Sequence, residues 1–184
     1  MPAFSRLQYF WLAYLSRPAQ HRTLYRLIRR RKPRQIVEMG LGDGQRTLRM
    51  IRLAARLAGP DKIHYVGVDL FEARPAGTQG LSLKQAHRLL KSSPARVQLV
   101  PGDPLAALTR MANALGNTDL VVVSADQDPE SLAKAWFYVP RMLHARSCVL
   151  EEFTVEGSAV PELRSVDARE IRRRAGSDRT RRAA

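Results

Sequence analysis

Residues 36–47 constrain the fold of this chain more than any other part of its sequence. They read Ile-Val-Glu-Met-Gly-Leu-Gly-Asp-Gly-Gln-Arg-Thr, a short apolar run followed by three closely spaced glycines and then by helical periodicity. Glycine allows a sharp turn and lets a ligand approach the backbone without a Cβ in the way. The free amides at the start of the following helix favour negative charge. This order predicts a parallel α/β unit whose glycine loop holds a nucleotide-bearing ligand.

The middle of the chain alternates strand-like and helix-like patterns. Strands are predicted at 35–38, 64–69, 96–100, 119–124 and 147–151, and helices at 45–58, 83–90, 105–115 and 129–143. The fourth strand is an almost unbroken apolar run, as expected for a strand buried on both faces. Right-handed crossovers then give a doubly wound, mostly parallel Rossmann-like sheet of five or six strands.

Charge and pattern divide the chain into three parts. Residues 1–33 form a basic N-terminal helical segment broken near Arg17-Pro18, residues 34–163 the Rossmann-like domain, and residues 164–184 an Arg-rich tail, of which residues 172–184 are expected to fray. The net charge of +14 lies wholly in the ends: residues 1–34 carry nine basic and no acidic groups, and residues 164–184 carry eight basic and three acidic groups. The basic ends are either solvated flanks or sites of non-specific contact with a polyanion.

The glycine spacing narrows the choice of ligand. The spacing of Gly40, Gly42 and Gly44 is one residue shorter than the dinucleotide fingerprint, and Glu38 stands two positions before it. This pattern resembles the first motif of class I S-adenosylmethionine-dependent methyltransferases. The resemblance implies that the loop, with Leu41, wraps the methionine end of S-adenosyl-L-methionine and that the acid at Glu38 helps to hold its ammonium group. A glycine turn kept for packing alone is the alternative.

Two further carboxylates follow predicted strands at spacings similar to that family. Asp69 ends the second strand, where with Leu70 it is expected to hold the cofactor ribose, because a carboxylate can accept both hydrogen bonds of a diol. Asp103, after Gly102, looks like the family's third motif, in which the acid receives the adenine amino group. Asp69 as a surface loop cap and Asp103 as a helix N-cap are the alternatives, and for Asp103 both roles are compatible.

The stretch after the fourth strand is similar to the Asp-Ala-Asp-His segment of small-molecule O-methyltransferases. Ser124 stands at its first acid, Asp126 matches the second and Gln127 replaces the histidine. We predict Asp126 to be a substrate-facing polar group or general base. Metal-dependent relatives bind Mg²⁺ or Ca²⁺ here, with an Asp-Asn pair after the fifth strand. Because this chain has Glu151 and Glu152 instead, we expect no metal, although Asp126, Glu151 and Glu152 carry suitable oxygen ligands.

The C-terminus departs from the family, which usually continues with a helix and an antiparallel hairpin. Only residues 153–184 follow the fifth strand, so we expect the hairpin to be missing, with 154–155 and 158–160 forming one short strand at most. The fifth strand would then be nearly an open edge, which proteins normally cover. We expect the N-terminal helices or the second subunit of a homodimer to cover it.

One main function and two alternatives follow. The main prediction is a cytoplasmic S-adenosylmethionine-dependent methyltransferase acting on an oxygen or nitrogen nucleophile, most simply of a small molecule, with no membrane partner, because no apolar run reaches the ~18 residues needed to cross a bilayer. The lone Cys148, read as a small buried side chain, fits a reducing compartment. The alternatives are a non-catalytic binding module with basic ends and, disfavoured by the glycine spacing, an NAD-dependent oxidoreductase. The sequence does not identify the methyl acceptor.

Overall fold

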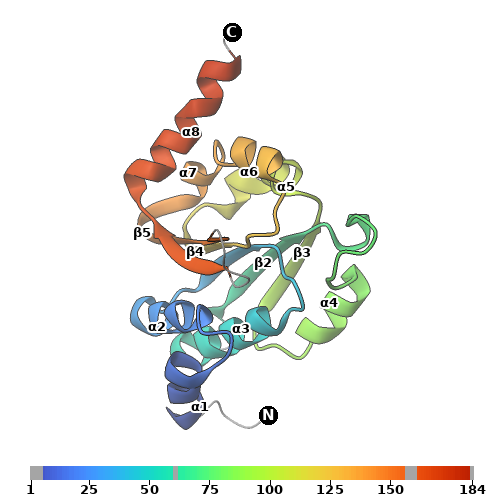
Figure 1. Ribbon diagram of the computed structural model, residues 1–184. Helices are drawn as coiled ribbons and strands as arrows, with labels where there is room; N and C mark the ends of the chain where they lie inside the picture. Colours follow the sequence, from blue (N-terminus) through green and yellow to red (C-terminus); the bar gives the residue numbers. More distant parts are fainter. Residues whose placement is uncertain (1–5, 60–61, 156–160, 183–184) are drawn as a thin grey trace.

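A six-stranded sheet in the order β3-β2-β1-β4-β5-β6 forms the centre of the molecule (Figure 1). The computed structural model describes residues 6–59, 62–155 and 161–182. The first five strands pair in parallel and β6 pairs antiparallel with β5. The strands are β1 (Gln35–Met39), β2 (His64–Asp69), β3 (Arg96–Pro101), β4 (Thr118–Val123), β5 (Leu143–Phe153) and β6 (Glu162–Val166). The predicted doubly wound, mostly parallel α/β fold is therefore confirmed.

Helices cover both faces of the sheet. On one face lie α2 (His21–Arg31), α3 (Gln45–Ala58) and α4 (Leu83–Leu90), with α1 (Arg6–Phe10) and the π-helix η1 (Trp11–Leu15) against them. On the other lie α5 (Pro104–Met111), α6 (Pro129–Ala135), α7 (Val139–Met142) and α8 (Ala168–Arg182). Short 3₁₀ turns, η3 (Phe71–Ala73) and η4 (Ala112–Leu115), complete the chain's regular structure in the described residues.

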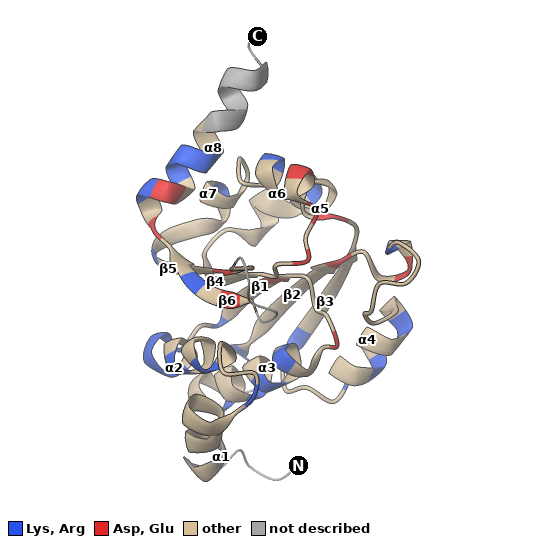
Figure 2. Ribbon diagram, in the orientation of Figure 1, with Lys and Arg blue, Asp and Glu red and all other residues tan. Residues whose placement is uncertain are grey.

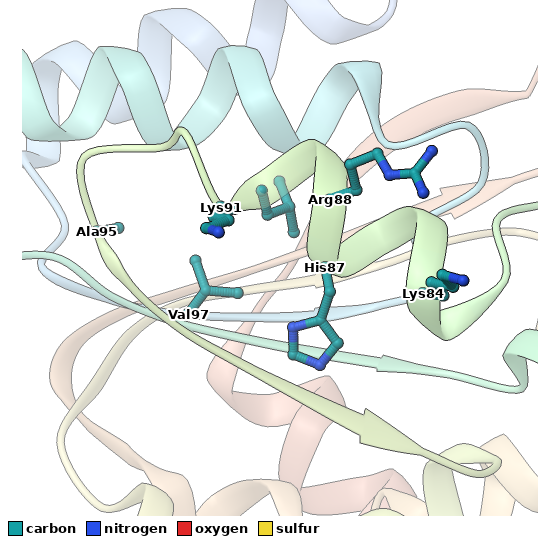
Figure 3. A pocket seen from close by; sticks show the side chains of 7 residues that line it. Lys84, His87, Arg88, Lys91, Ala95 and Val97 are labelled. Carbon is teal, nitrogen blue, oxygen red and sulfur yellow. The ribbon is translucent and has the colours of Figure 1, made fainter.

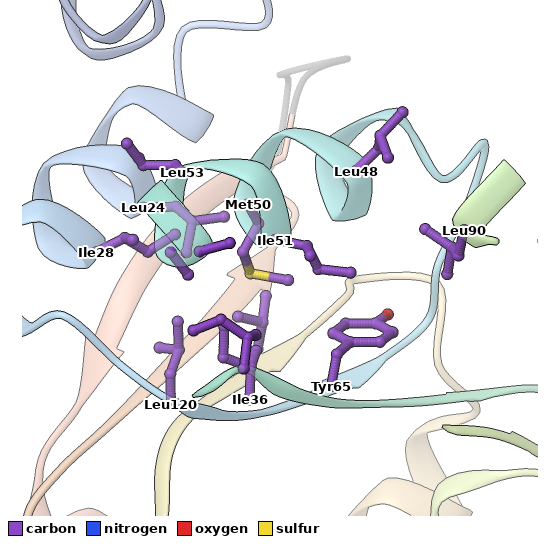
Figure 4. Close-up of a cluster of buried hydrophobic side chains, with 14 of the residues drawn as sticks. Leu24, Ile28, Ile36, Leu48, Met50, Ile51, Leu53, Tyr65, Leu90 and Leu120 are labelled. Atoms are coloured by element: carbon purple, nitrogen blue, oxygen red, sulfur yellow. The ribbon is translucent and has the colours of Figure 1, made fainter. Parts of the chain in front are cut away.

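Helix α3 shows how the sequence builds the core beneath the glycine loop. It begins after Gly44, which adopts the left-handed conformation, and ends at Ala58, with Gly59 as its C-cap. Its apolar face is fully buried against the sheet and α2, as Figure 4 shows for Met50 and Ile51 above Ile36. Burying one such side chain contributes about 1.5–3 kcal/mol. This packing holds the start of α3, and hence the loop, at the carboxyl edge of β1.

The C-terminal part corrects the prediction of an open fifth strand. Strand β6 pairs along β5 from Val149 to Phe153, so neither the N-terminal helices nor a second subunit is needed to cover that edge. Arg164, which the predicted boundary placed in the tail, lies directly opposite Glu151 and pairs with it. Residues 154–155 are not a strand, and the predicted strand at 158–160 lies outside the described residues. The predicted boundary at 163/164 falls inside β6.

The Arg-rich tail is helical as far as Arg182, although we expected residues 172–184 to fray. Helix α8 begins after Asp167, whose Oδ1 accepts hydrogen bonds from the amides of Arg169 and Glu170. Ile171 is buried in the second core, and the guanidinium of Arg174 lies 4.6 Å from the ring centroid of Trp136. Among the described side chains of α8, a buried isoleucine and a stacked arginine thus attach this helix to the sheet domain.

Smaller differences concern helix continuity. The helix predicted at 129–143 is two short helices, α6 and α7, and β5 begins already at Leu143. The predicted break near Arg17-Pro18 is confirmed, since η1 ends at Leu15 and α2 begins at His21.

Cys148 is a free, half-buried thiol rather than a fully buried one. Among the described residues, no helix has the length and apolar character of a membrane span.

Candidate functional site

The glycine loop lies at the carboxyl end of β1, where open α/β sheets bind ligands. Gly40, Gly42 and Gly44 have φ angles of 87°, 57° and 72°, in the left-handed region that favours glycine. The Gly40 amide donates to the carbonyl of Val68 at 2.8 Å, and the Gly44 amide to that of Leu41 at 2.9 Å. The predicted strand, turn and helix are therefore present with the backbone that the three glycines permit.

The three glycines face different surroundings. A Cβ added at Gly40 would lie 2.5 Å from Nε2 of Gln127 and 2.7 Å from Cβ of Ser124, so the segment after β4 lies directly on it. A Cβ at Gly44 would lie 2.5 Å from a methyl group of Leu89. At Gly42 an added Cβ would meet nothing within 4 Å. Gly42 is thus the part of the loop that is open to a ligand.

Asp69 ends β2, as the sequence predicts, and its carboxylate joins the glycine loop to that strand. Its Oδ2 accepts a hydrogen bond from the Leu41 amide at 2.7 Å, and its Oδ1 accepts one from the Phe71 amide at 3.1 Å. The guanidinium of Arg74 also binds Oδ1. A carboxylate has about four lone-pair sites, so Asp69, although only 4% exposed, keeps capacity for a further donor.

Glu38 is fully buried and bound entirely by protein groups. Its Oε1 accepts from Nε of Arg46 at 2.8 Å and lies 2.7 Å from Nη2 of the same residue. Its Oε2 accepts from the hydroxyls of Thr47 and Tyr65, each at 2.6 Å. Burial and the nearby Glu38 charge raise the pKa of Tyr65 well above its usual value. Contact between Glu38 and a ligand ammonium remains a prediction, but the structure gives this carboxylate four other interactions.

Arg46 was not among the predicted site residues, yet it links the ends of three strands. Its Nη2 donates to the Gly40 carbonyl at 2.8 Å and to Oγ of Ser124 at 2.6 Å, and its Nη1 lies 2.7 Å from Oε1 of Glu152. Burial by itself lowers the pKa of Arg46, but the carboxylates of Glu38 and Glu152 outweigh this and raise it. The site therefore contains a permanent internal cation.

Glu152 connects this cation to the N-terminal helices. Its Oε1 also lies 3.3 Å from Nε2 of His21, the first residue of α2. Although burial raises the pKa of Glu152, the hydrogen bond from His21 and the charge of Arg46 lower it to about 2. His21 Nδ1 is buried and has no hydrogen-bond partner among the described residues. This connection could not be predicted from the sequence, because the N-terminal segment carries no motif of its own.

The residues after β3 lie beside this site but have other partners. The Gly102 amide donates to the Asp69 carbonyl at 2.9 Å, which brings the ends of β2 and β3 together. Asp103 caps α5, accepting from the Ala106 amide at 3.0 Å, and it also accepts from the Ser131 hydroxyl. The predicted N-cap is thus confirmed, whereas the adenine contact stays a prediction. Leu70 is half-buried directly after Asp69.

The predicted catalytic and metal candidates do not form one cluster in the described part of the chain. Asp126 is exposed and accepts a hydrogen bond from Gln127 at 2.8 Å. Glu151 is bound by the guanidinium groups of Arg164 and Arg174, which outweigh the effect of burial and lower its pKa. No group of three or more potential metal ligands is present among the described residues. Glu151 and Glu152 therefore serve as partners of arginines.

A separate cavity of about 450 Å³ lies between α4 and the edge strand β3 (Figure 3). It contains none of the predicted site residues. Its rim is basic and its floor is apolar, with Lys84, His87, Arg88, Leu90, Lys91, Ala95 and Val97 as the lining residues. The cavity is therefore separate from the residues of the glycine-loop site described above.

Comparisons with known proteins agree with the fold. No protein-family model and no curated protein matches the sequence. The O-methyltransferase TomG from Streptomyces achromogenes, involved in tomaymycin synthesis and solved with SAM, is 18% identical, with a TM-score of 0.59 over 90% of this chain and 69% of that chain. An O-methyltransferase from Bacillus cereus, solved with SAH, is 18% identical, with a TM-score of 0.57 over 88% and 69%.

A third similar structure is the methyltransferase PaMTH1 from Podospora anserina, solved with SAH. It is 19% identical, with a TM-score of 0.52 over 82% of this chain and 62% of that chain. Two further matched structures, from Staphylococcus aureus and Plasmodium falciparum, are spanned by this chain over 58% and 66% of their length. The geometry of the sheet and these similarities agree: the chain has the fold of class I S-adenosylmethionine-dependent methyltransferases.

Proposed function

We propose that the chain binds S-adenosyl-L-methionine and transfers its methyl group to an oxygen or nitrogen atom of a small-molecule acceptor. The observation that carries this proposal is the 2.7 Å hydrogen bond from the Leu41 amide to Asp69. It holds a carboxylate beside the glycine loop at the carboxyl edge of the sheet, where a ribose diol needs an acceptor. Neighbours with the same fold were solved with SAM or SAH.

The described residues fit the nucleoside half of this cofactor. After its three protein contacts Asp69 keeps lone-pair capacity for one further donor, such as one hydroxyl of the ribose, and space is open above Gly42. We expect Leu70 and Gly102 to border the nucleoside, and Asp103 to receive the adenine amino group in addition to its role as N-cap.

The cofactor would supply an electrophilic methyl group, so the chain's own task is mainly to align the acceptor with it. Asp126 is the candidate base that would take the acceptor's proton, because it is exposed directly after β4 and only Gln127 binds it among the described residues. The carboxylates of Glu151 and Glu152 are held by arginines, which supports a reaction without a divalent metal. The half-buried thiol of Cys148 fits the reducing cytoplasm that we propose for this protein.

Binding by isothermal titration tests the cofactor assignment. SAM and SAH are expected to bind the wild type, whereas NAD is not. Gly42→Arg places a long side chain in the open space of the loop and should abolish binding. Gly77→Arg is the matched control, since Gly77 also has a positive φ, of 85°, and open surroundings. Tight NAD binding without any response to SAH would contradict the proposal.

A non-catalytic binding module is the second candidate. The observation in its favour is the internal cation Arg46, which takes acceptors that would otherwise face a ligand. Release of SAH from SAM in the presence of a panel of phenol, carboxylate and amine acceptors separates the two functions. Turnover that falls at least about 100-fold in Asp126→Asn, in the range of general-base effects, supports the enzyme. Cofactor binding without turnover on any acceptor supports the module.

We also propose a homodimer and retain polyanion contact as a hypothesis. Large apolar side chains are exposed along α1 and η1, namely Leu7, Phe10, Trp11, Tyr14 and Leu15, and such a stripe is a typical interaction surface. The described basic residues of α2 and α8 lie on opposite faces of the sheet (Figure 2), so these residues do not combine into one basic patch. Light scattering after size exclusion should give a dimer that Trp11→Glu converts to a monomer; a monomeric wild type would contradict the dimer.

A further inference from the structure

The acceptors nearest the glycine loop are already paired within the protein. Glu38 accepts three hydrogen bonds, from Nε of Arg46 on Oε1 and from the hydroxyls of Thr47 and Tyr65 on Oε2, and its Oε1 also lies 2.7 Å from Nη2 of Arg46. The charge of the residue in the position expected to hold a cofactor ammonium is therefore already matched by a guanidinium inside the protein.

The next acceptors along the sheet edge are occupied in the same way. The Gly40 carbonyl accepts from Nη2 of Arg46 at 2.8 Å and from the Ser124 hydroxyl at 3.0 Å, which uses both of its lone pairs. Ser124 in turn accepts from Arg46 at 2.6 Å, and the Glu152 carboxylate is 2.7 Å from Nη1. One guanidinium thus takes acceptors at the ends of β1, β4 and β5.

Charge and burial make this arrangement persistent. The Arg46 side chain is 8% exposed and lies between the carboxylates of Glu38 and Glu152, which are 0% and 7% exposed. Removing one partner from a buried ion pair is strongly unfavourable. An incoming ammonium would have to displace the guanidinium from both carboxylates. Its binding would therefore only replace ion pairs that the protein already makes.

We propose that Arg46 is the specificity-determining residue of the glycine-loop site. Its guanidinium replaces a ligand ammonium, so the site selects the nucleoside half of its ligand and is indifferent to an amino group at the other end. This inference rests on the proposed function and deepens it, because it names which half of the cofactor carries the affinity. Asp69, with lone-pair capacity left, and the open space at Gly42 are the features that hold that half.

The test compares SAH with its des-amino analogue, in which hydrogen replaces the amino group. Isothermal titration of the wild type should give dissociation constants that agree within about threefold. A site that bound the ammonium through hydrogen bonds to charged groups would lose about tenfold or more on removal of the amino group. SAH that binds the wild type at least tenfold more tightly than the analogue therefore overturns the inference while leaving the proposed function intact.

Arg46→Lys provides the second readout. The shorter side chain keeps the charge beside Glu38 but cannot reach all of the present acceptors, so the affinity ratio should shift about tenfold towards SAH. Arg52→Lys, an exposed position on the same helix, is the matched control and should leave the ratio unchanged. An unchanged ratio in a folded Arg46→Lys variant contradicts the inference, and if that variant does not fold, the wild-type ratio decides. Failure of both ligands to bind the wild type overturns the proposed function and the inference together.

Discussion

The carboxylate of Glu38 and the guanidinium of Arg46 form an ion pair, with 2.7 Å between Oε1 and Nη2 and at most 8% of either side chain exposed. Such a pair is favourable only when both groups are otherwise well hydrogen-bonded, because both charges are taken out of water. Here the hydroxyls of Thr47 and Tyr65 also donate hydrogen bonds to the carboxylate. Ser124 accepts a hydrogen bond from the guanidinium, and Glu152 forms a second ion pair with it. The ends of three strands are thereby fixed relative to the start of α3.

Loss of the Glu38 carboxylate should therefore be strongly destabilising. Glu38→Ala leaves a buried guanidinium with Glu152 as its remaining charged partner, and we expect the free energy of unfolding to fall by about 3–5 kcal/mol. Urea denaturation followed by circular dichroism measures this. The control is Glu130→Ala, which removes the exposed ion pair with Lys134 and should change stability by about 1 kcal/mol or less. Equal effects of the two substitutions would show that the buried pair contributes little.

The Glu152 carboxylate should make stability depend on acid pH. Its pKa is lowered from 4.5 to about 2 in the folded chain, so folding favours the ionised form. This stabilisation is fully present above about pH 4.5 and is lost as the pH falls towards 2. At 1.36 kcal/mol per unit, the shift corresponds to about 3 kcal/mol. Urea midpoints between pH 6 and pH 2.5 should fall more steeply for the wild type than for Glu152→Gln; parallel curves would contradict this.

The strands and the loop were predictable because their signals are local. The apolar run of β4 and the glycines after β1 specify burial and backbone conformation by themselves. Strand β6 was missed because Arg164 reads as a tail residue, and only the register with β5 shows that its charge is matched by Glu151.

The side-chain partners in the site were less accessible to prediction than its backbone. The motif places Glu38 beside the loop. Which cation Glu38 binds depends on where the Arg46 side chain points from the first turn of α3. Arg46 stands there in the sequence among several other arginines of the same helix. The only available signal was that Arg46 lies next to Thr47, shortly after the glycines. This signal did not show that Arg46, rather than Arg49 or Arg52, would bind Glu38.

Two substitutions can separate the structural role of Asp103 from its proposed contact with the ligand. Asp103→Ala removes the side chain that caps α5, and we expect a loss of about 1 kcal/mol. Asp103→Asn keeps a good N-cap and should stay within about 0.5 kcal/mol of the wild type in urea denaturation. Affinity for SAH, measured on the same two variants, should then fall in both if the carboxylate receives the adenine amino group. Unchanged affinity in Asp103→Asn would leave Asp103 with its capping role alone.

Gly40 and Gly42 should respond differently to the same substitution. Both have positive φ, so alanine introduces backbone strain of about 1 kcal/mol at either position. At Gly40 the new methyl group would also lie within 2.8 Å of Ser124, Asp126 and Gln127, whereas at Gly42 it meets nothing within 4 Å. Overpacking adds about 1–3 kcal/mol, so Gly40→Ala should lose about 2–4 kcal/mol and Gly42→Ala about 1 kcal/mol in urea denaturation. Equal losses would mean that the segment after β4 moves away from Gly40 without resistance, and it would then be a mobile cover over the loop rather than a fixed wall of the site.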